Sequence, residues 1–146
     1  MKHLKLYSIP IAYMLVYVVA ILVTGVWLFL LSQGLGSADM MQTLTYVITF
    51  PEPKSLHNFI EVATPHIFAM GTLIFVVAHF MLFSTNISQR FSLRVSVLLF
   101  VVALLNIVAY LAIIFGLVVS GWVKLVTLVV FVLLFLLLLG MVAFSL

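Results

Sequence analysis

The sequence contains very little charge and no cysteine. Only 6% of its 146 residues are charged and 67% are apolar, whereas about 25% of the residues of a soluble domain are charged. Because so few charged side chains cannot cover a surface that faces water, the composition excludes a soluble enzyme, a disordered chain and a nucleic-acid-binding module. The absence of cysteine excludes disulfides, thiolate metal sites and a cysteine nucleophile. The chain is therefore predicted to be an integral membrane protein.

Four apolar stretches are long enough to cross a bilayer, which takes about 20 residues of helix. They are residues 10–33, 65–83, 95–119 and 125–145. Their side chains are continuously apolar and do not alternate as in a barrel strand, so each stretch is predicted to be a helix. The connecting segments are too short for a separate soluble domain. The sequence thus predicts a single all-α membrane domain over 1–146, a polytopic four-transmembrane-helix bundle.

The basic residues predict the orientation of the bundle. With four spans, both termini and residues 84–94 lie on one side of the membrane. That side carries Lys2, Lys5, Arg90 and Arg94, and the other side carries Lys54 and Lys124. The positive-inside rule therefore places both termini in the cytoplasm, with the loop over residues 34–64 on the outer face, which is the periplasmic face in a Gram-negative cell. The N-terminus lacks a small-residue cleavage site after a short apolar core, so the first span is expected to be retained.

Two patterns in the third span concern helix packing. Ala112, Gly116 and Ser120 are spaced four residues apart and predict a small-residue ridge that lets another helix approach closely. Asn106 and Tyr110, also four apart, are expected to hydrogen-bond across helices. The fourth span is nearly all leucine between residues 133 and 139 and is expected to face lipid.

The second span and the residues before it contain most of the polar chemistry. They include His57, Glu61, His66 and His79. Thr64 and Pro65 are a typical N-cap and first-turn pair, which predicts that the span begins at Pro65 and follows a short interfacial helix from about Ser55. The alternative is one long helix from Ser55 that is kinked at Pro65.

The first functional hypothesis is that His66 and His79 are axial ligands of haem b, for which imidazole is a common ligand. In a helix they lie about 20 Å apart along the axis and about 140° apart around it, near opposite membrane surfaces. The other spans contain no histidine, so the second ligand would come from a second copy, a partner subunit or a methionine such as Met70. The alternative is that both histidines lie at the membrane interfaces and hydrogen-bond to backbone, lipid or a neighbouring helix.

The second hypothesis is a proton-handling cluster of Glu61, His57 and His66 beside a quinone head group, with Tyr13 and Tyr17 as phenol donors. In a continuous helix, one polar stripe is formed by His57, Glu61, Thr64, Phe68, Thr72, Phe75 and His79. In a homo-oligomeric transporter or channel, this stripe and Glu61 would line the path. The alternative is that Glu61 is solvated among the lipid headgroups. No metal site is predicted, because the histidines and Glu61 do not converge on one face.

The segment LHNFIEVATPHIFAMGTLIFVVAHFMLF resembles the second helix of small four-span bacterial inner-membrane proteins of unassigned function, which are often encoded near c-type cytochromes. The shared motif is Glu61, Thr64, Pro65, His66, Gly71 and His79. The segment is also similar to b-type cytochrome membrane subunits in carrying two histidines on one span, although the partner histidines of those subunits are absent here.

The resemblance implies a membrane subunit of a respiratory or electron-transfer system that binds haem b or quinone. Its implied partners are the lipid bilayer, other membrane subunits or a second copy, and a c-type cytochrome. The alternatives are a non-catalytic anchor or assembly subunit and a small transporter. No nucleophile–base arrangement and no phosphate-binding glycine loop is present, so the chain is not expected to be an enzyme on its own.

Overall fold

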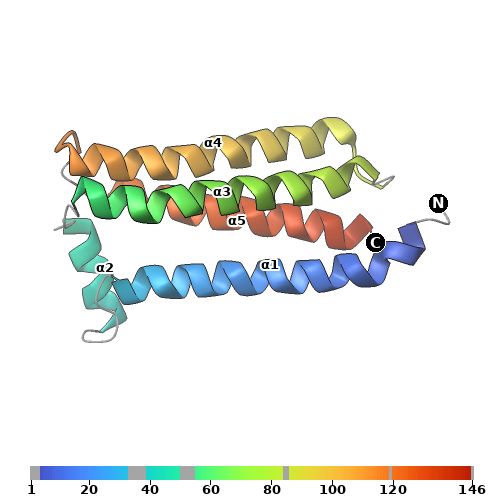
Figure 1. The fold of residues 1–146 in the computed structure, drawn as a ribbon, viewed down its shortest axis with the longest axis horizontal. Helices are drawn as coiled ribbons and strands as arrows, with labels where there is room; N and C mark the ends of the chain where they lie inside the picture. The colour runs from blue at the N-terminus through green and yellow to red at the C-terminus, as the bar shows by residue number, and fades with distance from the viewer. Residues whose placement is uncertain (1–3, 33–38, 50–54, 84–85, 119, 146) are drawn as a thin grey trace.

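The computed structural model describes residues 4–32, 39–49, 55–83, 86–118 and 120–145. These residues form α1 (Leu4–Ser32), α2 (Met40–Thr49), α3 (Leu56–Phe80), the short 3₁₀ helix η1 (Met81–Phe83), α4 (Gln89–Ile114) and α5 (Trp122–Ser145). Among them, α1, α3, α4 and α5 are long and apolar enough to cross a membrane, and Figure 1 shows them running alongside one another. The predicted four-span helical bundle is confirmed. The predicted span ends at Gln33 and Val119, and Lys2 and Lys54, lie outside the described residues.

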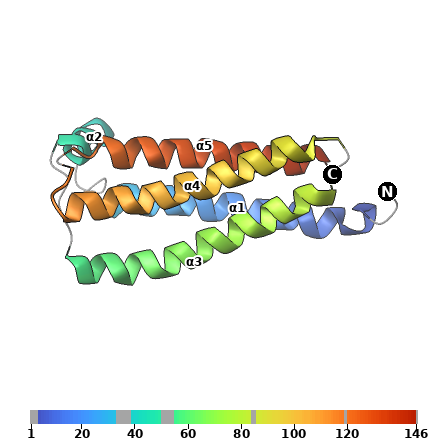
Figure 2. The same ribbon diagram turned by 90° about the horizontal axis from the view of Figure 1, so that it is seen from above.

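The helix with the most packing partners is α5. It packs on α1, α2 and α3 and most extensively on α4, and Figure 2 shows α4 and α5 along each other. Phe135 and Leu138 of α5 are almost completely buried together with Leu99 of α4 and Ile74 of α3. The expectation that the fourth span faces lipid therefore holds for only part of its surface: Leu133, Leu136 and Leu137 are exposed, whereas Phe135, Leu138 and Leu139 belong to the core. A helix that is apolar on every side suits both lipid and protein neighbours, so its composition does not reveal which surrounds it.

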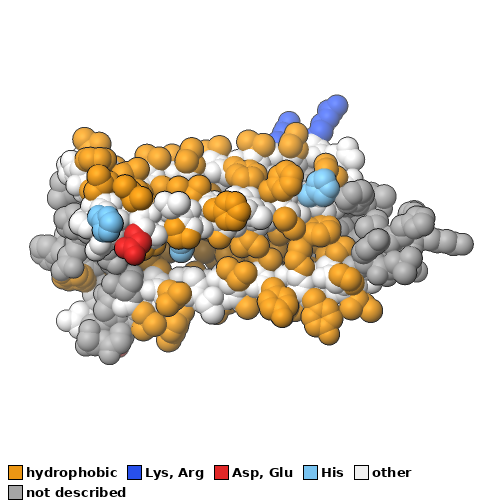
Figure 3. Space-filling view, viewed as in Figure 1, with side chains coloured by type: hydrophobic (Ala, Val, Ile, Leu, Met, Phe, Trp, Pro, Cys, Tyr) orange, Lys and Arg blue, Asp and Glu red, His pale blue; other side chains and the backbone are white. Residues whose placement is uncertain are grey.

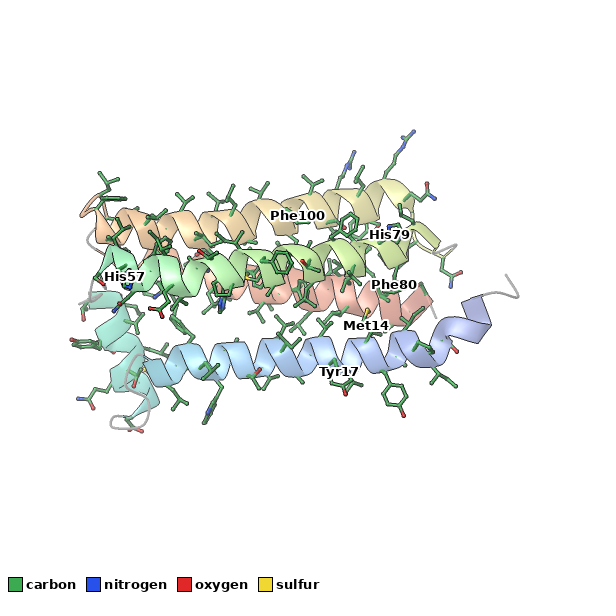
Figure 4. The ribbon with its side chains drawn as sticks, in the orientation of Figure 1. Met14, Tyr17, His57, His79, Phe80 and Phe100 are labelled. Carbon is green, nitrogen blue, oxygen red and sulfur yellow. The ribbon has the colours of Figure 1, made fainter. Side chains whose placement is uncertain are left out.

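Helix α1 packs against the core as far as Leu22, and the rest of the helix does not join the core. Ile11 and Val18 belong to the buried core, and Leu22 is the last residue of α1 that packs against it. Figure 4 shows Met14 pointing toward the other helices and Tyr17 pointing away from them. Because α1 lies against the core along only part of its length, space remains between its second half and the other helices.

Residues 56–80 form one continuous helix, with Pro65 inside it. The predicted start at Pro65 is wrong, and the alternative of one long helix from Ser55 is correct. Ser55 is the N-cap, and its hydroxyl accepts a hydrogen bond from the backbone N–H of Asn58 at 3.2 Å. Pro65 removes only the hydrogen bond to the carbonyl of Glu61. This carbonyl lies less than two turns from the polar end of the helix, where water can satisfy it.

The short helix between the first two spans is α2, and it is not formed by residues 55–64 as predicted. Thr43 and Val47 of α2 are each only 2% exposed, and the backbone N–H of Gly121 donates to the carbonyl of Ile48 at 3.1 Å. A Cβ on Gly121 would overlap the carbonyl oxygen of Val47. Glycine at 121 therefore allows the end of α2 to pack directly on the start of α5.

Helix α4 ends at Ile114, so the predicted ridge of small residues along the third span does not form. Gly116 has a φ of +68°, a backbone conformation that glycine adopts without steric cost. The N–H of Leu117 turns back to the carbonyl of Ala112 at 2.8 Å. Gly116 therefore terminates the helix, as glycine commonly does after a C-terminus.

The Gly121 contact leads to the first prediction. We expect Gly121→Ala to loosen α2, because the added methyl group has no room beside Val47. The chain has no native cysteine, so Thr43→Cys supplies a single reporter thiol in the buried face of α2. In the Gly121→Ala background, a maleimide should label this introduced thiol about tenfold faster, equivalent to ~1.4 kcal/mol of lost docking free energy.

The matched control is Gly140→Ala, because a Cβ on Gly140 meets open space. It should leave the labelling rate of the introduced thiol unchanged. Equal labelling rates in the Gly121→Ala background and in the chain that carries only Thr43→Cys would contradict the proposed docking role of Gly121.

Candidate functional site

Of the predicted haem ligands, His66 lies near the middle of α3 and His79 lies at its C-terminal end. His66 lines a cavity at the end of the bundle that carries α2, and His79 lines a smaller one near the other end. Figure 4 shows His79 far from His57, which lies in the first turn of α3. Met70 packs against the hydrophobic core and is not among the residues that line the cavity of His66. The fold therefore keeps His66 and His79 apart, and haem binding stays a prediction.

The stripe predicted along α3 forms an exposed face of the helix. Its exposed members are His57, Glu61, Thr64, Phe68, Thr72, Phe75 and His79. Figure 3 shows histidine and acidic side chains on the surface at the α2 end of α3, and a histidine again toward the other end. His66 lines the cavity instead, so the predicted cluster of Glu61, His57 and His66 is divided between two surroundings. Within the described part of the chain, no group of three or more metal-ligating side chains is present.

Tyr13 and Tyr17 lie in the first half of α1 and are each more than 60% exposed. Figure 4 shows Tyr17 directed away from the bundle. The predicted phenol donors are therefore remote from the cavity of His66, which meets α1 only at Gly25, Leu28 and Phe29.

The cavity of His66 has a volume of about 450 Å³ and lies where α1 leaves the core. Its walls come from α1, α3, α4 and α5, and its residues are Gly25, Leu28, Phe29, Asn58, Phe59, Val62, Ala63, His66, Asn106, Ile107, Tyr110 and Lys124. His66, Leu28 and Val62 are exposed, whereas the residues from α4 and α5 are half-buried, so the cavity opens between α1 and α3. Figure 3 shows the surface hollowed at this place. A mouth between two membrane helices admits a ligand from the bilayer.

The floor of the cavity holds a lysine between two aromatic rings. The Nζ of Lys124 lies 4.3 Å from the ring centre of Tyr110 and 4.9 Å from that of Phe29. The ring of Phe59 packs 5.4 Å from that of Tyr110. An ammonium over aromatic faces is attracted by the negative potential of the rings, and this attraction grows where water is scarce. The contacts therefore hold a positively charged donor at the cavity in partly desolvated surroundings.

Asn106 connects the cavity wall to α5. Its Nδ2 donates to the hydroxyl oxygen of Thr127 at 3.2 Å, and that hydroxyl donates to the carbonyl of Val123 at 2.8 Å. The expectation that Asn106 hydrogen-bonds across helices is confirmed. Tyr110, one turn further along α4, contributes its ring to the Lys124 and Phe59 contacts.

The sequence interpretation missed Lys124 as a site residue and treated it only as a topology marker. A signal was nevertheless present. Asn106 and Tyr110 precede the C-terminal end of the third span, and Lys124 lies at the start of the fourth. These positions are at the same end of the bundle as His66, which follows the start of α3 by about three turns.

One comparison with known proteins places the chain in a family. A family model described as a transmembrane helical domain, Aq_1264_TM, matches residues 29–146. The chain belongs to the Aq_1264_TM family. The matched region contains α2 to α5 and all the polar residues of the cavity. This protein of the Aq_1264_TM family is accordingly a multi-pass membrane protein in contact with lipid. No curated protein and no solved structure matches the chain.

The second prediction concerns the link between α4 and α5 in this Aq_1264_TM protein. A double-mutant cycle of Asn106→Leu and Thr127→Val should give a coupling free energy of about 0.6 kcal/mol, the average for hydrogen bonds between membrane helices. The measurement is the free energy of unfolding in detergent, obtained from titration with a denaturing detergent.

Thr24→Val is the matched control, because the hydroxyl of Thr24 donates to carbonyls of its own helix. A cycle that pairs Asn106→Leu with Thr24→Val should show no coupling. If the Asn106 and Thr127 substitutions were strictly additive, the hydrogen bond would not stabilise the packing of α4 on α5.

Proposed function

We propose that this chain is a membrane subunit of an electron-transfer system and that it holds the head group of a quinone in the cavity of His66. A quinone has a flat ring with two carbonyl oxygens and an apolar tail. The observation that carries the proposal is a cavity that combines apolar and aromatic walls, an opening between two membrane-spanning helices and several lining residues that can donate hydrogen bonds. Such a pocket with a few placed polar groups is the usual form of a small-molecule site.

The donors suit carbonyl oxygens. The ammonium of Lys124 has donors and no acceptor, while the Tyr110 hydroxyl, the Asn58 amide and the His66 imidazole can each donate a hydrogen to a ligand oxygen. The aromatic rings of Phe29, Phe59 and Tyr110 line the same cavity and offer flat faces against which a quinone ring can stack. The exposed Leu28 and Val62 at the mouth leave an apolar way out for the tail.

The same cavity suits haem b less well. Two axial ligands normally hold the iron of a b-type haem in an electron carrier, and His66 is the only histidine among the cavity residues. His79 lies about 20 Å away along α3. A haem on His66 would therefore need its second ligand from another chain, whereas a quinone can be held by residues of this chain alone.

The proposed orientation in the membrane places the cavity where a redox partner on the outer face could reach it. With both termini in the cytoplasm of a bacterium, the cavity lies near the outer face of the inner membrane, because it is at the end of the bundle opposite the start of α1 and the end of α5. A redox protein that docks on the outer face, such as a c-type cytochrome, would then be within reach of the bound quinone. The chain supplies the binding site, and its partners supply the electron path.

The third prediction uses the space at Gly25. A Cβ on Gly25 meets no surrounding atom within 4 Å, so Gly25→Leu can extend into the cavity with little strain. Decylubiquinone binding by the purified protein in maltoside detergent, measured by calorimetry, should weaken at least about tenfold, which corresponds to ~1.4 kcal/mol.

Gly140→Leu is the control, because Gly140 also has open space around it but does not line the cavity. It should bind decylubiquinone like the wild type. Equal dissociation constants for Gly25→Leu and Gly140→Leu would contradict binding in this cavity.

The fourth prediction separates the cavity histidine from an exposed one on the same helix. His66→Leu should weaken decylubiquinone binding about tenfold, because a buried carbonyl would lose a hydrogen bond worth ~1.4 kcal/mol. His57→Leu removes an exposed imidazole outside the cavity and should leave the dissociation constant unchanged.

An absorption spectrum of the natively purified protein tests whether haem binds instead of quinone. A b-type alpha band in the reduced-minus-oxidised spectrum that disappears in His66→Leu would favour haem and contradict the assignment of His66 to a quinone.

A further inference from the structure

A second, smaller cavity lies near the other end of the bundle, between α3, η1 and α4. Its volume is about 170 Å³, and it is lined by Phe75, Ala78, His79, Met81, Leu82, Gln89, Ser92, Leu93 and Ser96. Most of the lining is apolar, and the polar groups are one imidazole, one amide and two hydroxyls. The cavity of His66 shares none of these residues.

The hydroxyl of Ser92 distinguishes this cavity from an ordinary packing defect. Ser92 is only 6% exposed, and among the residues that the structure describes, none hydrogen-bonds to its Oγ. Ser96 is equally buried, but its hydroxyl donates to the backbone carbonyl of Ser92 at 2.9 Å. A buried hydroxyl without a partner costs roughly 1–3 kcal/mol. Native structures rarely leave such a group unpaired unless a ligand or water completes it.

We propose that this second cavity binds the carbonyl oxygen of an apolar amphiphile, with the Ser92 hydroxyl as the hydrogen-bond donor. His79 lies at the exposed rim, stacked on Phe75 with ring centres 5.9 Å apart, so an imidazole and an aromatic face border the mouth. The small volume accommodates part of a head group, and the exposed Leu82 and Leu93 beside it suit an apolar remainder. A quinone and the ester group of a phospholipid both present such a carbonyl.

The position of the cavity explains why α3 carries two histidines within its membrane-spanning length. His66 and His79 are about 20 Å apart along the helix, and each lines a different cavity at a different depth. The second site stands on Ser92 and its surroundings and does not require the first site to bind quinone.

The experiment counts decylubiquinone bound per chain in maltoside detergent, which contains no carbonyl group. The wild type should bind two equivalents. Ser92→Ala and Gly25→Leu should each bind one, and the double variant should bind none. Ser145→Ala is the matched control, because its hydroxyl donates to the carbonyl of Val142 outside both cavities, and it should bind two.

The thermal stability of Ser92→Ala distinguishes a binding role from a structural one. Without ligand, this variant should be as stable as the wild type or more stable, because an unpaired hydroxyl is removed. In the Gly25→Leu background, decylubiquinone should raise the melting temperature of the chain that retains Ser92. It should not raise the melting temperature of the chain that also carries Ser92→Ala. A ligand-free Ser92→Ala that melts well below the wild type would show a structural hydrogen bond and overturn the proposal.

A lipid comparison identifies the source of the carbonyl. The same variants are melted in nanodiscs of ester phospholipid and of the corresponding ether phospholipid. A Ser92-dependent gain in melting temperature with the ester lipid alone would assign the site to lipid, and one that requires decylubiquinone would assign it to quinone. If Ser92→Ala changes neither decylubiquinone binding in detergent nor the melting temperature in both lipids, the second site is overturned. This conclusion does not depend on the result for Gly25→Leu. If Ser92→Ala reduces decylubiquinone binding but Gly25→Leu does not, the proposed function is contradicted and the second site stands.

Discussion

The packing of α5 against α3 and α4 is the constraint on which the other features depend. Phe135 and Leu138 are buried with residues of both neighbouring helices, and the first residues of α5 are held by α2 through Gly121. These contacts fix where Lys124 enters the bundle. Since α1 packs against the core only as far as Leu22, the cavity of His66 opens beside the rest of that helix. The position of the site therefore follows from the full packing of α3, α4 and α5 and the partial packing of α1.

The cavity gathers polar side chains near one end of the membrane-spanning helices. A lysine, a histidine, two asparagine amides and a tyrosine meet among leucine, isoleucine and phenylalanine side chains. Polar groups at membrane depth are energetically unfavourable and usually mark a ligand or a path. Here the cation lies between aromatic faces, and one amide joins α4 to α5. The cavity that these residues line opens between α1 and α3, which favours a ligand that dissolves in the bilayer.

The three histidines of α3 lie in three different surroundings in the folded chain. His57 lies on the exposed face with Glu61, His66 lines the larger cavity, and His79 borders the smaller one. A step of 13 residues leaves two side chains about 140° apart around a helix, which is why the two membrane histidines do not share a face. Spacing alone showed that they diverge. It could not show that each meets a cavity, because the cavities are made largely by residues of other helices.

The order of the amino acids was enough to reveal the membrane class and the four helical spans, because hydropathy and length are properties of each segment alone. The sequence interpretation misplaced the short helix and the start of α3. Ser55 and Pro65 both indicated a helix start, and only the folded chain shows that the helix begins after Ser55 and continues through Pro65. It singled out His66 as a residue of interest but left Lys124 and Ser92 unnoticed. Which helix is central, where the cavities lie and which polar groups meet there emerged only from the folded chain. In a bilayer, lipid-facing and protein-facing surfaces are equally apolar, so the pattern of a span does not encode its rotation or its neighbours.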